Sequence, residues 1–527
     1  MITTKLKLLG AGVAIFTLMS TAAFAEVVLN RGSAADPESL DPHKTSTTYE
    51  ADLLRDLFAG LMAQDKDAGV IPGAAESYTV SADAKTYTFK LRADGKWSDG
   101  SPVTADDFVF SWQRAVNPDT ASEYAYLLAP VVNAEDITAK KMKLEDLGVK
   151  AIDAMTFEVT LKAPTPYFLE MLTHQVTYAV SKANVAAHPT DFTKPGNMVS
   201  NGAYTLAEFV PNDHIKLVKN GQFYDAANVK IDAVNYIPNE DRGAAVKRFE
   251  AGELDMYGDL PTEQLSDLRT KFGEQIKIGP FLGTYYYVFK TTKKPWEDLK
   301  VREAISMAID RDYLAEKVWG NSMIPAYSFV PPGVAGYKGP TLAYAGMSQL
   351  DREDAAKKIL GDLGYSEANP LKMDIHYNTS ENHKNVAIAI QSQLKPLGVA
   401  VTLTNTDTKT HYGLLEQHGD FDVARAAWVA DYKDPENFLA LCKSGTGNNY
   451  AEYSNKDYDE LLAKAAAEGD AAKRMDNLAA AEAIGVTRDL CVVPLLYYSS
   501  HNIVSSKLSG WDINVMDSHP TRWMSKQ

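Results

Sequence analysis

Alternating hydrophobic and polar residues predict two half-buried β-strands in the N-terminal third of the chain, at residues 86–91 and 157–161. Between them, Thr104 and Asp107 have the spacing of a helix capping box. The apolar residues that follow recur at helical spacing and predict one amphipathic helix. Its buried face holds Phe108, Val109, Trp112 and Val116. The N-terminal third therefore mixes strands and helices.

The C-terminal half shows a regular alternation of helix and strand patterns. In order, it contains helix 354–361, strand 371–377, helix 386–394 and strand 399–405. An apolar run at 421–429 then predicts a buried strand, and a capping-box pattern at 454–457 predicts the start of another helix. This alternation is typical of α/β folds in which helices cover a sheet. Because no flexible linker separates the two halves, we expect lobes joined by strands that cross between them.

The first 25 residues have the pattern of a secretory signal peptide. Lys5 and Lys7 precede an apolar stretch at 8–19, and residues 23–25 have the small-x-small form that signal peptidase cleaves. The apolar stretch is shorter than the roughly 20 residues that span a bilayer, which argues against a membrane anchor. No cysteine lies near the cleavage site to carry a lipid. We therefore expect a mature chain that begins at Glu26 and works outside the cytoplasm.

Composition and charge narrow the class of protein. The chain has 527 residues, 45% of them hydrophobic and 23% charged, which suits several packed domains. Its formal net charge of −16 repels phosphate backbones, so we expect no nucleic-acid partner. The only cysteines are Cys442 and Cys491. In an oxidising compartment we favour a structural disulfide over the alternative, a reactive cysteine, because no C-x-x-C motif is present.

The sequence lacks the motifs of a secreted enzyme. It contains no G-x-S-x-G elbow, no H-E-x-x-H zinc helix and no phosphate-binding loop, so we expect no catalytic residue, metal ion or cofactor. Tyrosines are abundant, with 27 in the chain, including the runs 285–287 and 497–498. Tyrosine suits the wall of a binding cleft, although at least half of these residues are expected in the core.

Asp431 is the one isolated residue that suggests a ligand contact. It follows the apolar strand 421–429, three positions after Trp428, at a strand end where α/β folds expose ligand-binding groups. The alternative is that Asp431 caps a helix or pairs with an arginine, and the local pattern does not decide between them.

Residues 90–114, KLRADGKWSDGSPVTADDFVFSWQR, resemble the signature of the family 5 extracellular solute-binding proteins, especially its oligopeptide-binding members. The resemblance continues over essentially the whole mature chain. Further matching segments are 39–44, 200–205, 284–287, 308–311, 377–380 and 421–425.

The resemblance implies an α/β fold of the two-lobed periplasmic binding protein type (type II, cluster C-like), with three structural domains and a hinge. Domain I would comprise residues 26–58, 184–282 and 499–527, and domain II residues 59–183. Domain III would comprise residues 283–498. A ligand would be enclosed between lobes that close by hinge bending.

The resemblance also implies how a ligand is held. In oligopeptide binders an aspartate of the W-x-A-D-Y segment holds the peptide's ammonium group, and here that residue is Asp431. The peptide backbone would pair with strand segments, as in β-augmentation. The residues implied for these contacts are Arg425, Ala426, Ala427 and Trp428 on one side and 45–48, including Ser46 and Thr48, on the other. Tyr124, Tyr286 and Tyr498 would line the cleft, and His383 would meet a ligand carboxylate, unless it is a solvated residue at a helix start.

The chain departs from the family pattern at several positions. Glu416 stands where oligopeptide binders carry an arginine that is available for the ligand's carboxylate, which suggests a preference for ligands with an extra positive charge. Ser46 replaces an acidic residue. The family's usual cysteine pair is replaced by Gly283 and Val429, so a bridge between Cys442 and Cys491 would be a different one.

The sequence therefore predicts a monomeric periplasmic receptor that captures short peptides and delivers them to an inner-membrane ABC permease. One alternative keeps the scaffold but changes the ligand to a murein peptide, a dipeptide, or a non-peptide amine or opine-like conjugate. A more remote alternative is a secreted hydrolase.

Overall fold

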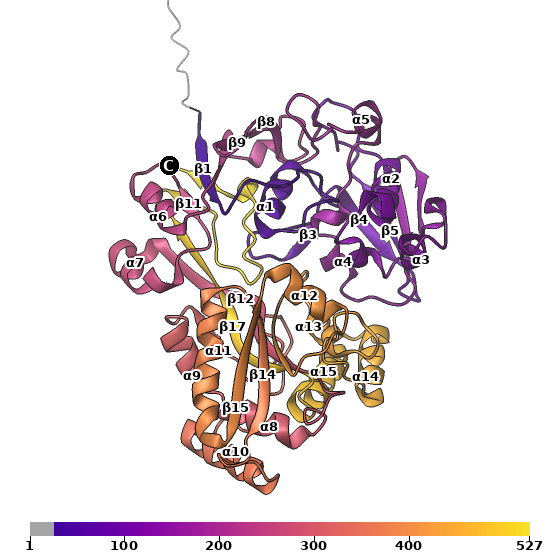
Figure 1. The fold of residues 1–527 in the computed structure, drawn as a ribbon. Helices are drawn as coiled ribbons and strands as arrows, with labels where there is room; N and C mark the ends of the chain where they lie inside the picture. Colours follow the sequence, from indigo (N-terminus) through magenta and orange to yellow (C-terminus); the bar gives the residue numbers. More distant parts are fainter. Residues whose placement is uncertain (1–25) are drawn as a thin grey trace, which may run out of the picture.

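Two lobes, joined by long shared strands, make up the computed structural model, which describes residues 26–527 (Figure 1). The predicted signal peptide lies outside the described residues. We define the N-lobe as residues 26–275 and 505–527, and the C-lobe as residues 290–492. Strands β12 (Ile276–Phe289) and β17 (Val493–Val504) pair with each other and run through both lobes. The prediction that crossing strands join the lobes is confirmed.

One mixed sheet of eleven strands extends through both lobes. Its order is β15-β14-β16-β12-β17-β11-β1-β10-β9-β8, with β13 beside β17. Strand β14 runs parallel to β15 and β16, as helix–strand alternation predicts. The C-lobe strands are β13 (Met323–Pro325), β14 (Leu371–Asn378), β15 (Val399–Thr406) and β16 (Val423–Val429). The N-lobe strands are β1 (Val28–Ser33), β8 (Tyr204–Val210), β9 (His214–Lys219), β10 (Ala233–Pro238) and β11 (Met256–Tyr257).

A smaller antiparallel sheet, of order β4-β5-β7-β6, lies in the N-lobe. Helix α2 (Ala105–Val116) covers it and buries Phe108 and Trp112 completely. Thr104 N donates to Asp107 Oδ2 at 3.0 Å, so the helix begins at the predicted capping box. The strands are β4 (Ala75–Val80), β5 (Thr86–Leu91), β6 (Val149–Asp153) and β7 (Thr156–Thr160), with the hairpin β2 (Met62–Gln64) and β3 (Val70–Pro72) nearby. The other N-lobe helices are α1 (Thr48–Leu57), α3 (Ala134–Thr138), α4 (Phe168–Met171), α5 (Lys182–Ala187), α6 (Arg242–Glu250) and α7 (Leu265–Phe272).

The C-lobe helices are α8 (Leu299–Ala308), α9 (Arg311–Tyr313), α10 (Gln349–Asp362), α11 (Glu381–Leu394), α12 (Thr408–Glu416), α13 (Glu436–Leu439), α14 (Lys456–Ala467) and α15 (Ala471–Glu482). The sequence pattern predicted α10, α11 and α14 at these positions, with α10 and α11 longer than expected, but it did not predict the other helices. The predicted cap of α14 is wrong by one residue. Asn455, rather than Ser454, accepts the amides of Asp457 and Tyr458, at 3.0 and 3.3 Å.

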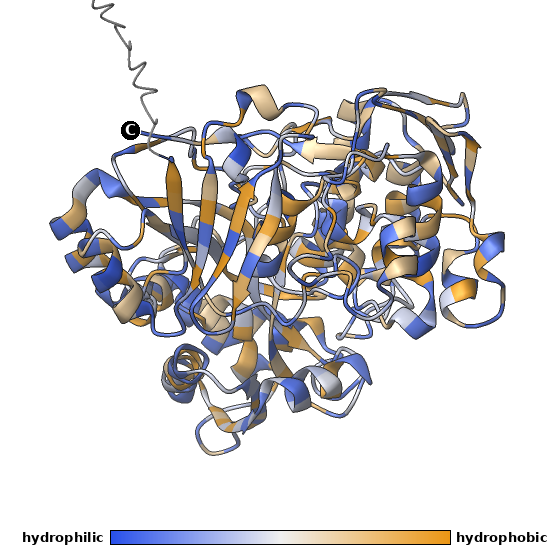
Figure 2. Ribbon diagram, turned by 90° about the horizontal axis from the view of Figure 1, so that it is seen from above, coloured by the Kyte–Doolittle hydropathy of each residue, from blue (hydrophilic) through white to orange (hydrophobic). Residues whose placement is uncertain are grey.

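Hydrophobic residues concentrate along the strands, while much of each helix surface is hydrophilic (Figure 2). The C-lobe core contains the disulfide that the sequence predicts, between Cys442 and Cys491, whose Cα atoms are 6.1 Å apart. The register of β12 against β17 shifts between Pro280 and Thr284. The expected domain boundary at 282/283 falls in this irregular stretch, and the boundaries stay a prediction.

Candidate functional site

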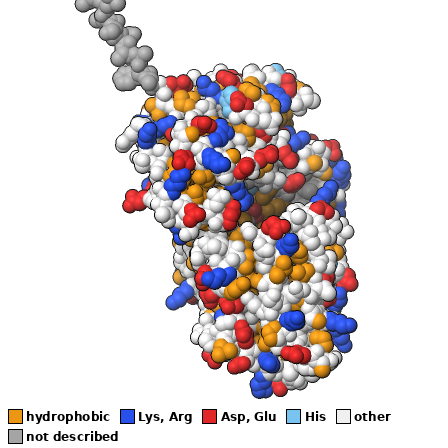
Figure 3. All heavy atoms as spheres, turned by 60° about the vertical axis from the view of Figure 1, so that its left-hand side comes forward, with side chains coloured by type: hydrophobic (Ala, Val, Ile, Leu, Met, Phe, Trp, Pro, Cys, Tyr) orange, Lys and Arg blue, Asp and Glu red, His pale blue; other side chains and the backbone are white. Residues whose placement is uncertain are grey.

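The surface is hollowed between the two lobes (Figure 3). Strand β16 ends two residues before Asp431, which bonds Tyr126 of the N-lobe, so the strand leads to the junction of the lobes. Among the described residues, β16 pairs with β12 along its whole length but with β14 only at Val423 and Ala424. The other edge of β16 is therefore free of strand pairing from Arg425 to Val429. Only the Arg425 carbonyl is taken there, by His411 Nε2 at 2.8 Å. A free edge of this kind can accept an extended chain as an added strand.

Asp431 follows β16 and has only neutral partners. Tyr126 of the N-lobe donates its hydroxyl hydrogen to Asp431 Oδ2 at 3.0 Å, and Asn437 Nδ2 donates to the same oxygen at 3.4 Å. Burial raises the pKa of Asp431 to about 6, although these two donors act in the opposite direction. No lysine or arginine within residues 26–527 forms an ion pair with this carboxylate. An ammonium group would supply the missing positive charge.

Arg425 presents the opposite case, a buried cation without a carboxylate. Its Nη1 donates to Asn378 Oδ1 and to the Tyr412 hydroxyl, and its Nη2 donates to the Tyr498 hydroxyl, each at 3.0 Å. The guanidinium carbon lies 4.7 Å from the centre of the Tyr285 ring. The residue is only 5% exposed, and no described acidic side chain pairs with it. An anionic ligand group would complete this arrangement.

His383 and Arg425 both lie beside the ring of Tyr285. The ring is buried, its Nδ1 has no hydrogen-bond partner, and its centre is 5.5 Å from that of Tyr285. Burial, and then the positive charge of Arg425, lower the pKa of His383 to about 3. The ring is therefore neutral at pH 7. It can offer a hydrogen bond to a ligand oxygen but no charge.

Trp428 positions Asp431 through a third side chain. The indole Nε1 of Trp428 donates to Asn437 Oδ1 at 2.8 Å, and the same oxygen accepts the backbone N–H of Asp431 at 3.1 Å. Asn437 itself is buried. One amide side chain therefore fixes both the backbone and the carboxylate of Asp431.

Tyr286 lies in the core, although we expected it to line the cleft. Tyr286 is 1% exposed and packs edge-on against Phe329. Side chains alternate along β12, so Tyr285 and Tyr287 share the face of Arg425 while Tyr286 points to the other side. Tyr498, in contrast, is brought to Arg425 as described above.

On the N-lobe side, Tyr124 lies beside Tyr126, the partner of Asp431, with ring centres 5.5 Å apart, whereas the amides of Ser46 and Thr47 are already engaged. Burial, followed by the charge of Asp431, raises the pKa of Tyr124 to about 12. Ser46 N and Thr47 N donate to Glu50 Oε2 at 3.2 and 3.1 Å, in the capping box that begins α1. These two amides are therefore not free to pair with a ligand backbone, in contrast to the expectation. Thr48 is exposed as the first residue of α1.

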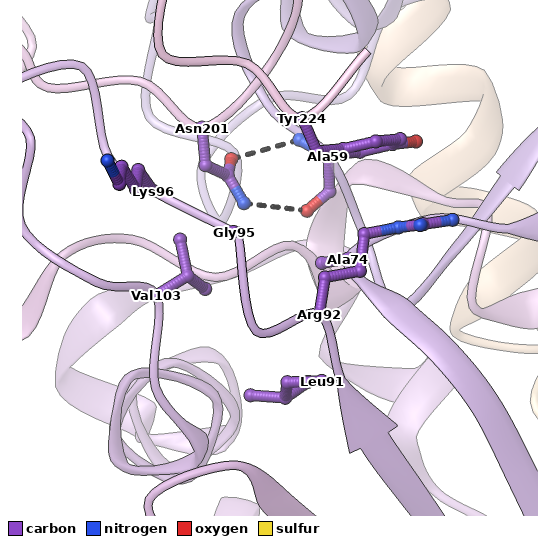
Figure 4. A pocket seen from close by; sticks show the side chains of 9 residues that line it. All are labelled: Ala59, Ala74, Leu91, Arg92, Gly95, Lys96, Val103, Asn201 and Tyr224. Atoms are coloured by element: carbon purple, nitrogen blue, oxygen red, sulfur yellow. Dashed lines mark hydrogen bonds between the residues drawn. The ribbon is translucent and has the colours of Figure 1, made fainter.

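Two small cavities lie elsewhere, inside the N-lobe. Figure 4 shows one of about 10 Å³, where Asn201 bonds both backbone groups of Ala59. The other, of about 30 Å³, is lined by Arg55 and Gln64 among others. Each has room for a water molecule or two, so neither is a peptide site.

Comparison with known proteins decides the family. The model of the bacterial extracellular solute-binding proteins, family 5 middle, matches residues 69–450. The chain belongs to this family. The periplasmic oligopeptide-binding protein OppA of Salmonella typhimurium is 40% identical to it over 523 residues, which cover 96% of each protein.

Solved structures of family 5 relatives have the same fold as this solute-binding protein. The unliganded open form of MppA, a periplasmic murein tripeptide binding protein, matches with a TM-score of 0.84 and 38% identity, covering 95% of this chain and 98% of MppA. Haemophilus influenzae OppA in complex with RPPGFSPFR matches with a TM-score of 0.79 and 35% identity, covering 95% and 99%. The expected two-lobed fold is thereby confirmed.

The sequence did not predict several contacts of the site in this solute-binding protein, among them those made by Asn378 and Tyr285 to Arg425. Tyr126 binds Asp431 from the other lobe, Asn437 fixes Asp431, and Tyr412 shares Arg425 with Tyr498. Asn437 carried a weak signal, since it stands six positions after Asp431 near the start of a short helix. No sequence pattern pointed to Tyr126 or Tyr412, because only the tertiary fold brings them to Asp431 and Arg425.

Proposed function

We propose that this protein is the periplasmic substrate-binding component of an ABC importer and captures short peptides between its lobes. The proposal rests on two charged residues that have no oppositely charged partner. One lies on strand β16 and the other on the segment that follows it. Arg425 lacks an anion and Asp431 lacks a cation, and the free edge of β16 lies between them. A zwitterionic peptide has a carboxylate at one end, an ammonium at the other and the backbone between them, which matches Arg425, Asp431 and the edge of β16 that lies between them.

The spacing of the two charges sets the size of ligand. Arg425 and Asp431 are six positions apart, and because β16 ends at Val429 their Cα atoms are at most roughly 20 Å apart, the length of a fully extended segment. Part of this length is bridged by the two side chains. An extended peptide advances about 3.3 to 3.6 Å per residue, so the site suits roughly three to five residues.

Glu416 supports a refinement of the ligand class. It ends helix α12 one turn after Tyr412, whose hydroxyl accepts from Arg425, so the two side chains share a face of the helix. Glu416 forms no ion pair with any residue of the described chain. We propose that it favours ligands with a basic side chain near their carboxylate end, as the sequence comparison suggested.

Transport requires further steps that we include in the proposal. Residues 1–25 would direct export and be removed, and the receptor would act as a monomer that delivers its ligand to an inner-membrane permease. No helix of residues 26–527 is long and apolar enough to cross a membrane. The family consists of substrate-binding transport components, which supports binding without turnover.

Isothermal titration with peptides of two to six residues tests the proposal. We expect dissociation constants of micromolar or tighter for peptides of three to five residues, equivalent to a binding free energy of about −8 kcal/mol. Each peptide is compared with its N-acetylated and C-amidated forms, which should bind more weakly. Mass spectrometry after incubation reports cleavage, and new fragments would indicate the hydrolase instead. Native mass spectrometry of protein purified from its own host would identify a non-peptide ligand.

A further inference from the structure

The segment that follows Asp431 crosses from the C-lobe and inserts a side chain into the N-lobe. Tyr432 is 7% exposed and is the only residue of 290–492 in the main apolar cluster of the described N-lobe. Its ring stacks on that of Tyr167, immediately before α4, with a centroid distance of 5.0 Å and an interplanar angle of 1°. Stacked aromatic rings of this kind contribute beyond the apolar area that they bury.

The next residue adds a polar contact between the lobes. Lys433 Nζ donates to the carbonyl oxygen of Ala68, in the turn between β2 and β3, at 2.8 Å. Lys433 also lies near Glu170 of α4. Burial raises the pKa of Glu170 to about 7, and the positive charge of Lys433 counteracts this rise.

The C-lobe holds this segment rigidly from the other side. Asp434 accepts two hydrogen bonds of 2.7 Å from Arg474 of α15, and both side chains are buried. The Tyr432 hydroxyl donates to Glu436 at 2.7 Å. The Arg474 guanidinium also faces the Tyr167 ring, at 5.5 Å. Tyr432 and Lys433 are therefore presented to the N-lobe from a fixed base rather than from a mobile loop.

We propose that Tyr432 and Lys433 form a latch that docks on Tyr167 and Ala68 and keeps the lobes closed over a bound ligand. The latch is joined directly to Asp431, so a ligand ammonium on Asp431 and the docked Tyr432 stabilise the same lobe arrangement. Any movement of the lobes that separates Tyr432 from Tyr167 would break the stack and expose both rings to water. This role rests on the proposed function only in that the enclosed ligand is a peptide.

Distance measurements between spin labels test the latch. Cysteines introduced by Lys140→Cys in the N-lobe and Lys456→Cys in the C-lobe provide exposed labelling sites, and both native cysteines are held in the disulfide. The labelled protein is measured with and without a saturating tripeptide, and peptide dissociation is followed by stopped flow. Variants are Tyr167→Ala, Tyr432→Ala, Tyr432→Phe and the double alanine variant. Tyr313→Ala, an exposed tyrosine of the C-lobe, is the matched control.

We expect each alanine variant to shift the lobes toward longer distances and to speed peptide dissociation at least tenfold. The double variant should be no worse than either single one, because both remove the same stack. Tyr313→Ala should behave like the parent protein, and Tyr432→Phe, which keeps the stack but loses the hydrogen bond to Glu436, should have a smaller effect than Tyr432→Ala. Circular dichroism and thermal unfolding verify folding, and Tyr167→Ala leaves the C-lobe intact if Tyr432→Ala fails to fold.

Unchanged distances and dissociation rates in a folded Tyr167→Ala variant would overturn the latch. If no peptide binds the parent protein, the proposed function fails, and the latch is then judged from the ligand-free distances. A shift to longer distances in Tyr167→Ala would still support it, and an unchanged distribution would refute it.

Discussion

Tyr126 of the N-lobe donates a hydrogen bond of 3.0 Å to Asp431 of the C-lobe, so the carboxylate is partnered across the cleft by a neutral phenol. A peptide ammonium would add a charge-assisted bond that Tyr126 cannot provide. We expect Asp431→Asn to weaken binding of a free tripeptide by about 30- to 1000-fold, or about 2 to 4 kcal/mol. Titration calorimetry measures the change. The N-acetylated peptide should bind parent and variant with similar affinity, and an equal loss for both peptides would contradict the role of Asp431.

Peptide affinity should depend on pH through the same residue. Asp431 has a pKa of about 6 in the ligand-free protein, raised by burial, so it is ionised at pH 7.5 and largely protonated at pH 5. An ammonium prefers the ionised form, so affinity should fall about tenfold for each pH unit well below 6 and stay constant above 7. Titrations between pH 4.5 and 8 measure this profile. Asp431→Asn should flatten it, and a parent profile without a bend near pH 6 would exclude Asp431 as the titrating group.

Arg425 should select for a free ligand carboxylate. Replacing it by glutamine removes the charge but retains a hydrogen-bond donor, and we expect affinity for a tripeptide to fall by about 10- to 100-fold, or about 1.4 to 2.7 kcal/mol. The C-amidated tripeptide should lose far less. Calorimetry with the two peptides separates a charge effect from general disruption, and a thermal unfolding curve verifies that the core around Tyr285 remains folded. Equal losses for the two peptides would count against the assignment.

Glu416 should tune selectivity rather than overall affinity. We expect Glu416→Gln to weaken binding of tripeptides that end in lysine by a few-fold, about 0.5 to 1 kcal/mol, because the carboxylate is exposed to solvent. Tripeptides that end in alanine should bind as before. Competition assays with the two peptides measure the ratio, and Glu381→Gln, another exposed acidic residue of the C-lobe, serves as the control. A ratio that does not change would remove Glu416 from the site.

The disulfide should stabilise the C-lobe without contributing to binding. Cys442 and Cys491 close a loop of 49 residues within an apolar core. Replacing both by serine should lower the free energy of unfolding by about 2 to 4 kcal/mol, through the greater entropy of the unfolded chain. Urea unfolding measures the loss, and peptide affinity at 25 °C should remain within twofold of the parent value. A loss of affinity with retained stability would instead link the bridge to the ligand.

Local patterns predicted the main elements of the fold, because burial imposes a strict period on each strand and helix. The buried face of α2, the order of helices and strands from α10 to β15, and strand β16 were evident in this way, but helix α12 was not. The alternation of side chains along a strand also explains why Tyr286 does not lie where we expected it. A run of three tyrosines alternates between faces, and the sequence alone does not say that Tyr286 faces the core while Tyr285 faces Arg425.

The candidate site could be predicted only where it lies on one continuous segment. Arg425 and Asp431 belong to a single strand and its extension, so a sequence resemblance could locate both. Tyr126 stands 305 positions before Asp431, and no local pattern connects them. Ser46 and Thr47 were predicted to offer their backbone amides to a ligand. In the structure both amides instead donate hydrogen bonds to Glu50.

Strand β17 lies in the middle of the large sheet, between β12 and β11, although it follows all the other strands of that sheet in the chain. The central gap that it fills therefore stays open until residues 493–504 have been made, so the sheet cannot be completed earlier. A protein that must be threaded through a membrane before it folds would benefit from this order. Late completion of the sheet would delay premature folding inside the cell, and a chain that stops before β17 should remain recognisable to proteases.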